Sequence, residues 1–429
     1  MLYYVRAGRI LAGAHDEAPI LDSVTGVLVH QMRDHSIRML PSARIEHGNF
    51  TAMSLPDLEQ PVVTWTEGGE ERAARWRSES GGSLPKRMVV ADDRMRADAA
   101  YRLTSQGTAI VWRGDYHNAR QLLQALARRV DAKARKAVSS LRDAFHQHRQ
   151  AQAQRAHTLG MLLLPFDADY TIPLRRAPDV RQACLEAYGQ PNEPFVASLR
   201  ELLGIIGAHE WRTKGVAVAG LHGRIHPHYG VFAPIRQEYV RLVAEAPLPS
   251  TTLAFDIGTG TGVLAAVLAE RGVEHVVATD SDPRAVACAR ENITRLDLDD
   301  KVEVVQTDLF PPGRAPLVVC NPPWIPGRPG SILERAIYDP EHRMLRAFLG
   351  GLPEHLERAG EAWLLLSDIA EHLGLRSRAT LTDMFDAAHM KVVGRLETRP
   401  EHPKSFDASD PLHAARAAEV TSLWKLALR

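Results

Sequence analysis

The sequence predicts an α/β protein. Its carboxyl-terminal half is expected to be a doubly wound, mostly parallel, seven-stranded sheet, preceded by an amino-terminal, largely helical region. Three observations lead to this prediction. After Thr251, strand-like apolar segments alternate with helix-like segments in regular order. A glycine-rich turn, Gly258–Gly262, separates the first of these strands from the first helix. Polar residues then end four consecutive strands, where ligands bind in sheets of this kind.

The chain is long enough for several domains, because 429 residues exceed what one ordinary core accommodates. We expect residues 1–87 to be a poorly defined extension, residues 88–194 a mostly helical accessory domain that docks a substrate, and residues 195–429 the α/β domain. The last boundary follows the turn-rich segment GQPNEP at Gly189–Pro194.

The extension carries few signals. Val27–Met32 and Pro61–Trp65 have the composition of short strands, whereas Thr66–Pro85 is rich in Gly, Ser and charged residues and is predicted to be a polar linker. Phe195–Ile206 is predicted to be helical, and Gly215–Gly220 and Gly230–Phe232 to be strands.

The composition indicates a soluble globular protein. Lys and Arg number 52 and so do Asp and Glu, so net charge gives no information about partners. The three cysteines have no metal-ligand or redox spacing, as expected for reduced thiols in the cytosol. No segment resembles a secretory signal or a membrane span, so we expect a cytoplasmic protein without membrane contact.

A long amphipathic helix is predicted from about His117 to His157, where apolar residues recur at three- and four-residue steps, with Gly160 as its stop. This segment contains nine Lys or Arg residues and two Asp. One interpretation is an ordinary solvated helix face, and the other is a basic surface for RNA or an acidic partner.

The alternation after Thr251 predicts the elements of the α/β domain. The strands are expected at Thr251–Asp256, His275–Asp280, Val302–Asp308, Leu317–Asn321, Ala362–Ser367, Val392–Thr398 and Glu419–Leu426. The helices are expected at Val263–Arg271, Pro283–Leu296, Ile332–Arg358 and Arg376–His389. Because no helix separates the last two strands, they are predicted to form an antiparallel pair at one edge of the sheet.

Three histidines lie close together at positions 222, 226 and 228. Their spacing matches no common zinc pattern, and no cysteine or acidic residue stands beside them. We therefore expect no metal site.

The glycine turn discriminates between two ligand classes. A dinucleotide site requires G-x-G-x-x-G, but the pattern here is G-x-G-x-G, and Val263 stands where the third glycine would be. Glycines permit positive φ and close approach of a ligand to the backbone. The helix that follows presents free N–H groups to the turn. The pattern therefore disfavours a pyrophosphate.

Four consecutive strands end in a polar residue or motif. Asp256 ends the first strand. Asp280 ends the second, where a carboxylate can accept hydrogen bonds from two ribose hydroxyls, and Asp308 ends the third, where it could meet an adenine amine. The fourth ends in NPPW, Asn321–Trp324. A single acidic residue at a strand end is often only a helix cap, but four such ends in succession indicate a ligand site.

DIGTGTG, TDSDP, TDL and NPPW, in this order and spacing, resemble the class I S-adenosylmethionine-dependent methyltransferases that carry an Asn-Pro-Pro-aromatic motif. Those enzymes methylate planar nitrogens, either the glutamine amide of peptide-chain release factors or the exocyclic amines of bases in RNA or DNA. The resemblance covers roughly residues 223–429. HYGVFAPIR, His228–Arg236, is also similar to the segment that closes over the cofactor in these families.

The resemblance implies S-adenosylmethionine as the cofactor. It also implies a set of cofactor contacts on the segments that match the family: Phe232, Pro234, Asp256, Gly258, Thr259, Gly260, Gly262, Asp280, Ser281, Asp308, Leu309 and Asn321.

The NPPW motif is the expected catalytic group. An amide or aniline-like nitrogen is a poor nucleophile, because its lone pair is delocalised. If Asn321 Oδ1 and the Pro322 carbonyl each accept an N–H hydrogen bond, they aim that lone pair and stabilise the positive charge that develops. Trp324 is expected to stack on the planar target, with core packing as the alternative. The related families usually have Tyr or Phe there, so Trp324 departs from both.

The sequence thus predicts an N-methyltransferase acting on a macromolecule, a translation factor or ribosomal RNA, with a slight preference for a protein glutamine amide. That preference comes from Ile325–Leu349, which resembles the segment that follows the motif in the release-factor family. The loop Glu401–Arg416 is expected to contribute to substrate selection. One alternative is a non-catalytic cofactor-binding module that docks RNA or protein, against which the intact NPPW argues. A nicotinamide oxidoreductase is a further alternative, against which Val263 argues.

Overall fold

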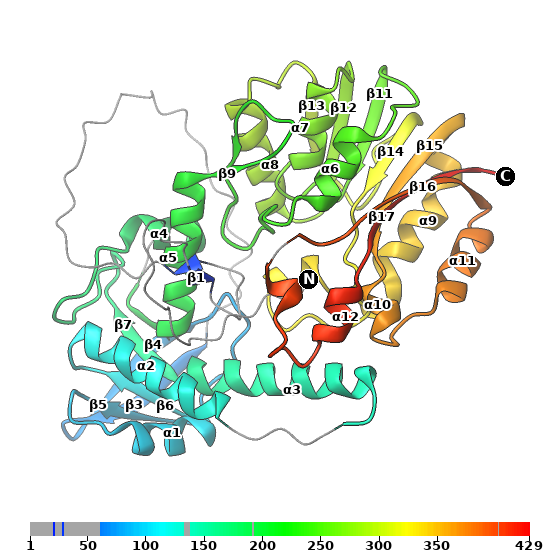
Figure 1. The fold of residues 1–429 in the computed structure, drawn as a ribbon. Coiled ribbons are helices and arrows are strands. Elements are labelled where there is room, and N and C mark those ends of the chain that lie inside the picture. The colour runs from blue at the N-terminus through cyan, green and yellow to red at the C-terminus, as the bar shows by residue number, and fades with distance from the viewer. Residues whose placement is uncertain (1–19, 22–27, 30–60, 133–137, 191–192, 402) are drawn as a thin grey trace, which may run out of the picture. The chain divides into compact units, whose positions relative to one another are not determined.

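The computed structural model describes residues 20–21, 28–29, 61–132, 138–190, 193–401 and 403–429 (Figure 1). The chain divides into two compact units, which we describe separately: Ala134–Ala153 with Glu210–Arg429, and Tyr4–Lys133 with Gln154–His209. None of the helices in the described residues is long and apolar enough to cross a membrane.

The first unit contains the seven-stranded sheet that the sequence predicts. Its strands are β11 (Leu253–Ile257), β12 (His275–Asp280), β13 (Val302–Gln306), β14 (Ala315–Cys320), β15 (Leu356–Ser367), β16 (Met390–Thr398) and β17 (Thr421–Leu428). The strand order is β13-β12-β11-β14-β15-β17-β16. The first five strands in this order are parallel, whereas β17 is antiparallel to both of its neighbours. The doubly wound arrangement and the antiparallel final pair are therefore confirmed, with β17 inserted between β15 and β16.

The helices assigned to this unit are α6 (Glu238–Glu245), α7 (Val263–Glu270), α8 (Pro283–Arg295), η1 (Leu333–Ala336), η2 (Pro340–His342), α9 (Arg343–His355), α10 (Ile369–His372), α11 (Arg378–Ala387), η3 (Pro403–Phe406) and α12 (His413–Ala418). They include α7, α8, α9 and α11 close to predicted positions, and α6, α10, η3 and α12, which were not predicted. The helix predicted over Ile332–Arg358 is reduced to two short turns and α9, because Glu341 and His342 have positive φ (57° and 59°) and interrupt it.

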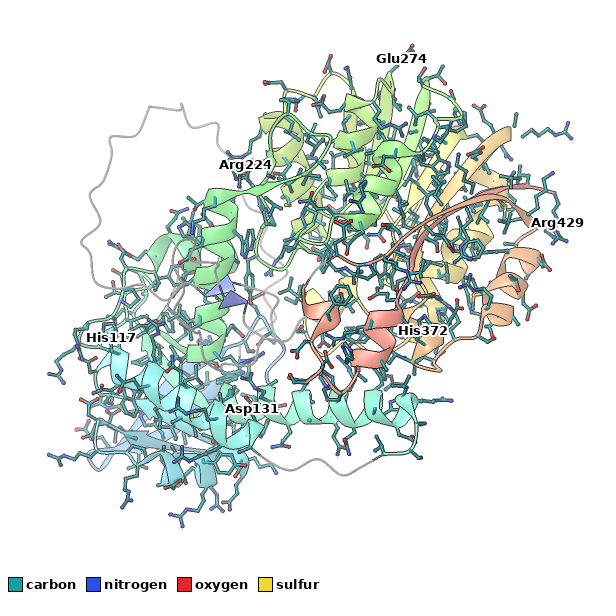
Figure 2. The ribbon with its side chains drawn as sticks, viewed as in Figure 1. His117, Asp131, Arg224, Glu274, His372 and Arg429 are labelled. Atoms are coloured by element: carbon teal, nitrogen blue, oxygen red, sulfur yellow. The ribbon has the colours of Figure 1, made fainter. Side chains whose placement is uncertain are left out.

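Two short strands precede the sheet. β9 (Val216–Ala217) pairs with β10 (Arg224–Ile225) in antiparallel fashion. The strand predicted at Gly230–Phe232 is absent from the described structure, and a turn with Gly230 at φ +85° takes its place. Figure 2 labels a residue at each end of the large sheet, Glu274 just before β12 and His372 in α10 just after β15. The ends near His372 are the carboxyl ends of the parallel strands.

The second unit is built on a six-stranded mixed sheet in the order β3-β4-β8-β7-β6-β5. Its strands are β3 (Val62–Glu67), β4 (Glu70–Arg77), β5 (Arg87–Ala91), β6 (Thr108–Trp112), β7 (Leu162–Phe166) and β8 (Phe195–Ser198). Its helices include α1 (Ala97–Ser105), α2 (Tyr116–Asp131) and α4 (Arg181–Tyr188), and β1 (Ile20–Leu21) pairs with β2 (Leu28–Val29). The division between the units falls inside α3 (Leu141–Gly160) and α5 (Leu199–Lys214).

This sheet corrects the predicted domain organisation. Helices make up most of the secondary structure of residues 88–194, but strands from all three predicted parts of the chain share one sheet. β4 lies in the predicted linker, and β8 lies where a helix was expected, yet they pair in parallel with Arg75 opposite Phe195. The boundaries at 87 and 194 therefore cut through a single sheet. Of the two strands predicted in the extension, Pro61–Trp65 is confirmed as β3, and much of Val27–Met32 lies outside the described residues.

The predicted long basic helix is two helices, α2 and α3, of which the second ends at Gly160 as expected. Several of its basic side chains are engaged within their own unit. Arg129 pairs with Asp98 at 2.8 Å, and Arg155 pairs with Asp131 at 3.1 Å. These ion pairs reduce the positive charge that the helices offer to a nucleic acid.

Glu201, near the start of α5, holds the segment that was predicted to be a linker. This buried carboxylate accepts hydrogen bonds from the Ser78 hydroxyl at 3.1 Å, from the backbone N–H of Glu79 at 3.0 Å and from the Ser80 hydroxyl at 2.6 Å. The Tyr188 hydroxyl donates to it as well, at 2.8 Å. The Ser-rich segment is therefore part of the folded unit.

We predict that Glu201→Ala destabilises the second unit by about 3 kcal/mol, because several buried donors lose their acceptor at once. The matched control is Glu193→Ala, since the Glu193 carboxylate is 43% exposed and pairs with Arg75 at the surface, and it should cost less than about 1 kcal/mol. Urea unfolding of both variants measures the difference. Equal losses would contradict the anchoring role of Glu201.

Candidate active site

The site lies at the carboxyl edge of the seven-stranded sheet. β11 pairs on one side with β12 and on the other with β14, with Ile257 opposite both Thr279 and Cys320. The glycine turn that follows β11 therefore emerges between the ends of its two neighbours. Asp280 closes β12, and Asn321 follows directly on β14. The sheet thus brings together the predicted residues of the first, second and fourth strands.

The glycine turn is fixed to β12 by its backbone. The N–H groups of Gly258 and Thr259 both donate to the Thr279 carbonyl, at 2.9 and 2.8 Å. Gly258, Gly260 and Gly262 have φ of +73°, +58° and +81°, which only glycine adopts readily. A Cβ at Gly260 would meet nothing within 4 Å, whereas one at Gly262 would lie 3.3 Å from Ala289 of α8. Gly262 thus allows close helix packing, and Gly260 borders open space.

Asp256, predicted as a cofactor contact, lies buried beneath the glycine turn. Its side chain is buried, and Oδ2 accepts hydrogen bonds from the Thr259 hydroxyl at 2.6 Å and from the Ala265 N–H at 3.1 Å. Burial raises the pKa of Asp256 to about 6, although these two bonds lower it. Asp256 therefore joins the glycine turn to the first turn of α7, beneath the surface that a ligand could reach.

Asp280 lies at the rim of the same turn. Its Oδ2 accepts the Gly260 N–H at 3.0 Å, and its Oδ1 accepts the Asp282 N–H at 3.0 Å. Burial raises the pKa of Asp280, against the effect of these bonds. Each carboxylate oxygen can accept a further bond. Ser281 follows Asp280 directly, and its carbonyl accepts a hydrogen bond from Gln306 at 3.5 Å.

The end of β13 is arranged by Thr279 rather than by Asp308. The Asp308 side chain is exposed, while the next residue, Leu309, has φ +64°. The buried Thr279 hydroxyl donates to the Leu309 carbonyl at 2.6 Å and holds this bend in place. Sequence reasoning missed Thr279, because a threonine inside a strand is typical of any sheet.

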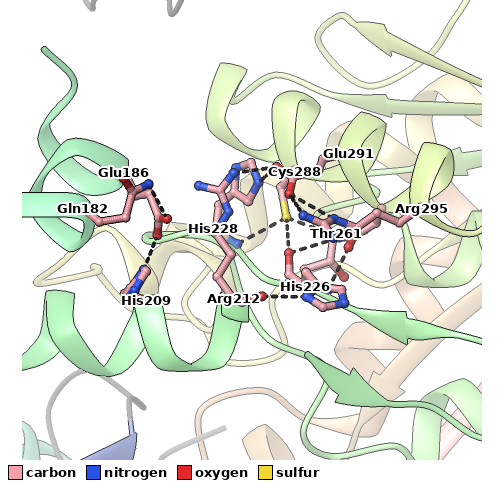
Figure 3. A network of polar contacts seen from close by, with 11 residues as sticks. Gln182, Glu186, His209, Arg212, His226, His228, Thr261, Cys288, Glu291 and Arg295 are labelled. Carbon is pink, nitrogen blue, oxygen red and sulfur yellow. Dashed lines mark hydrogen bonds and ion pairs between the residues drawn. The ribbon is translucent and has the colours of Figure 1, made fainter. Parts of the chain in front are cut away.

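The segment before the sheet is fastened to α8 by Asn292, which the sequence analysis also missed. The buried Asn292 side chain accepts the His226 N–H at 2.7 Å and donates to the Thr261 carbonyl of the glycine turn at 3.0 Å. On the same helix, Glu291 accepts a hydrogen bond from His228 at 2.7 Å (Figure 3). An asparagine within a helix carries no motif, so only the three-dimensional pairing identifies it.

Glu291 is the centre of a small polar network. Arg212 and Arg295 pair with it at 2.6 and 2.8 Å, in addition to His228. Burial raises its pKa, but the bonds from His228 and Arg295 outweigh burial, and the net pKa is well below the ordinary value. The third histidine of the cluster, His222, pairs instead with Glu270.

The histidines thus contact separate partners. Within the described part of the chain, no group of three or more His, Cys, Asp or Glu side chains could hold a metal ion. Of the two predicted contacts in the preceding segment, Phe232 is half-buried and Pro234 is buried.

The NPPW motif follows β14 directly. The Trp324 side chain is only 7% exposed, and its indole N–H donates to Asn321 Oδ1 at 2.9 Å. The ring of Tyr239 meets the indole edge to face, with centroids 6.4 Å apart. Pro322 is buried and Asn321 half-buried. The expected stacking of Trp324 on a target therefore gives way to the alternative, in which the indole packs in the core and contacts Asn321.

Comparison with known proteins agrees with this geometry. Residues 224–392 match the family described as the methyltransferase small domain. Release factor glutamine methyltransferase from Cereibacter sphaeroides is 32% identical over 178 residues, which are 38% of this chain and 63% of that protein. The tRNA1(Val) (adenine(37)-N6)-methyltransferase of Vibrio parahaemolyticus is 37% identical over 95 residues, 21% of this chain and 40% of that protein.

The chain spans less than two thirds of the length of these curated relatives. Among solved structures, the ribosomal protein L11 methylase from Lactobacillus delbrueckii subsp. bulgaricus has 18% identity and a TM-score of 0.33, covering 48% of this chain and 86% of that one.

The strand order and the glycine turn are those of the class I S-adenosylmethionine-dependent methyltransferase fold, and the sequence matches are to proteins of the same kind. Within that fold, residues 224–392 are the part of the chain that is similar to the methyltransferase small domain.

The residues around the turn fit S-adenosylmethionine, the cofactor of this class. The open space at Gly260 admits a ligand against the backbone, and Asp280 keeps acceptor capacity for ribose hydroxyls. At Gly258 a Cβ would lie 2.9 Å from Met344 Cε, the end of a flexible side chain that can shift, so the φ of +73° is what favours glycine there.

We predict that replacing Asp256 by Asn changes how stability depends on pH. The native pKa of about 6 lies above the ordinary 3.8, so the native state retains a proton that the unfolded chain releases between these values. The retained proton on Asp256 contributes up to about 3 kcal/mol to the free energy of unfolding. This contribution is full below about pH 4 and is lost as pH rises through 6.

Asp256→Asn does not titrate, so it should gain stability relative to the wild type from pH 4 to pH 7. Thermal unfolding of both proteins across that range provides the comparison. A difference that stays constant with pH would contradict a buried, proton-retaining Asp256.

Proposed function

We propose that this protein is an S-adenosylmethionine-dependent N-methyltransferase that methylates a planar nitrogen of a macromolecule. The observation that carries the proposal is the place of Asn321. It follows the strand beside β11, and its carboxamide oxygen has a fixed orientation set by the Trp324 indole at 2.9 Å. A nitrogen whose lone pair is delocalised reacts only when it is held in position, and a fixed acceptor beside the cofactor turn can hold it.

In this proposal, the residues of the chain orient the nitrogen and hold its protons. S-adenosylmethionine, when bound, supplies an electrophilic methyl group. Asn321 Oδ1 has a second lone pair, and with the Pro322 carbonyl it would accept the two N–H groups of the target. These bonds aim the nitrogen lone pair and stabilise the charge that develops on it, so no strong base is required before transfer.

The preferred acceptor is a glutamine amide of a protein. Two observations support this choice over an RNA base. The alignment with the release factor enzyme covers 178 residues, against 95 for the tRNA enzyme. In addition, the segment after the motif, which resembles the release-factor family, folds back on the motif: Ile325 N–H donates to the Ile337 carbonyl at 3.1 Å, and Asp339 N–H donates to the Ile325 carbonyl at 2.9 Å. The segment thus forms a closed loop directly beside Asn321.

We predict that Asn321→Ala lowers single-turnover methyl transfer by roughly 10²- to 10³-fold, because one preorganised acceptor is lost from the transition state. Asn321→Asp should also be impaired, since it places a negative charge beside a cationic donor. Cofactor affinity should stay within a few-fold of wild type in both variants.

The measurement is single-turnover transfer from labelled S-adenosylmethionine to release-factor protein and, separately, to RNA, with a calorimetric cofactor titration for each variant. Near-normal turnover of Asn321→Ala would refute the planar-nitrogen assignment. If the wild type binds S-adenosylmethionine but transfers no methyl group to the release-factor protein or to RNA, the result would favour the non-catalytic module.

A second prediction concerns the ribose. Asp280→Ala should weaken cofactor binding by on the order of 2 kcal/mol, because a charged acceptor for two hydroxyls is lost together with the partner of the Gly260 N–H. The matched control is Asp282→Ala, two residues away, which removes the side-chain cap on the Arg284 N–H of α8. In calorimetry, the Kd of the Asp282→Ala control for S-adenosylmethionine should lie within about three-fold of the wild-type value. Equal losses in both variants would remove Asp280 as the ribose ligand.

A further inference from the structure

In the hydrogen bond between Trp324 and Asn321, the chemistry of the indole fixes which group donates and which accepts. An indole N–H can only donate a hydrogen bond. The Asn321 atom that lies 2.9 Å from it must therefore be the carboxamide oxygen and not the nitrogen. Turning the carboxamide over would bring two donors together, which is unfavourable in a buried setting. The indole thus selects one of the two orientations of Asn321.

The indole itself is held on several sides. Trp324 is buried, and so is the Tyr239 ring that meets it at an interplanar angle of 86°. The Arg236 guanidinium lies 5.7 Å from the centroid of the indole, within the range of a cation–π contact. A ring packed in this way has few alternative rotamers, so its N–H keeps its direction.

Arg236 is in turn fixed by two buried carboxylates. Its Nε donates to Glu238 at 3.2 Å, and its Nη1 donates to Glu419 at 3.2 Å. The Ser367 hydroxyl, at the end of β15, also donates to Glu419, at 2.7 Å. The contacts therefore run from the end of β15 through Glu419, Arg236 and Trp324 to Asn321, across four segments distant in sequence.

We propose that Trp324 is a positioning residue whose indole N–H presents the Asn321 oxygen as the acceptor for the target nitrogen. This inference rests on the proposed function and adds a requirement to it. The ring of a phenylalanine at this position has no N–H to donate, and a tyrosine hydroxyl could donate or accept and would select neither orientation. The proposal therefore gives a reason why this chain has Trp at position 324, where the related families usually have Tyr or Phe.

The test replaces the N–H without changing the shape. Trp324→3-benzothienylalanine substitutes sulfur for the indole N–H and keeps the bicyclic ring, and Trp324→Phe is the encoded counterpart. The matched control is Trp363→3-benzothienylalanine, because the Trp363 indole is also fully buried and donates to Glu361 at 2.9 Å in the same sheet. Single-turnover rate and the Kd for S-adenosylmethionine are measured for each.

We expect both Trp324 variants to lose about tenfold or more in transfer rate, with cofactor Kd within about twofold of wild type and the control at the wild-type rate. A wild-type rate in the Trp324→3-benzothienylalanine protein would overturn the inference. The proposed function is tested separately by Asn321→Ala. If Asn321→Ala is impaired while Trp324→3-benzothienylalanine is not, the proposed function stands and only the positioning role of Trp324 is contradicted.

A second measurement reports on the bond without any turnover. The indole N–H signal of Trp324, identified by its loss in Trp324→Phe, should exchange with solvent faster in Asn321→Ala than in wild type, because its acceptor is gone. Unchanged exchange would contradict the hydrogen bond itself.

Discussion

The position of β11 between β12 and β14 is the constraint on which the site depends. Parallel pairing on both sides brings three carboxyl ends to one edge, and the Thr279 carbonyl then accepts two N–H groups of the turn that leaves β11. The same register sets Asp280 on one side of that turn and Asn321 on the other. Asp280 and Asn321 are thus placed by backbone pairing, which side-chain substitutions at the rim leave intact.

A second layer of buried polar contacts refines what the backbone places. Asp256 ties the turn to α7, and Asn292 ties it to the segment that precedes the sheet. On the β14 side, Arg236 and Trp324 hold the carboxamide of Asn321. Each of these groups is buried and hydrogen-bonded, so removing one partner leaves another unsatisfied. Such networks favour a single geometry, which is useful where a poor nucleophile must be aimed.

The sequence predicted the seven-stranded sheet well, because its signals are local: alternating segments, a glycine turn and polar strand ends. The six-stranded sheet was not predictable in the same way. β4 and β8 pair across more than a hundred residues, and the exposed, charged face of EERAARWR in β4 resembles a linker when taken alone. The structure therefore divides into two units, whereas the sequence predicted three parts.

At the site, the motif residues follow the ends of the strands as predicted, but their contacts were not all predictable. The burial of Asp256 and of Trp324 depends on packing against α7 and Tyr239, which no spacing rule encodes. Thr279 and Asn292 belong to common residue types in common elements, so only tertiary pairing distinguishes them. Short motifs report which atoms can react, whereas the supporting contacts are specified by the whole fold.

The most direct test of the central claim is to identify the atom that receives the methyl group. The wild-type protein would be incubated with methyl-deuterated S-adenosylmethionine and fractionated protein and RNA, and the labelled products sequenced by mass spectrometry. The account predicts label on a planar nitrogen, specifically the side-chain amide of a glutamine in a translation factor. Label on a carbon or an oxygen atom, or on an amine that is not conjugated to a π system, would contradict it.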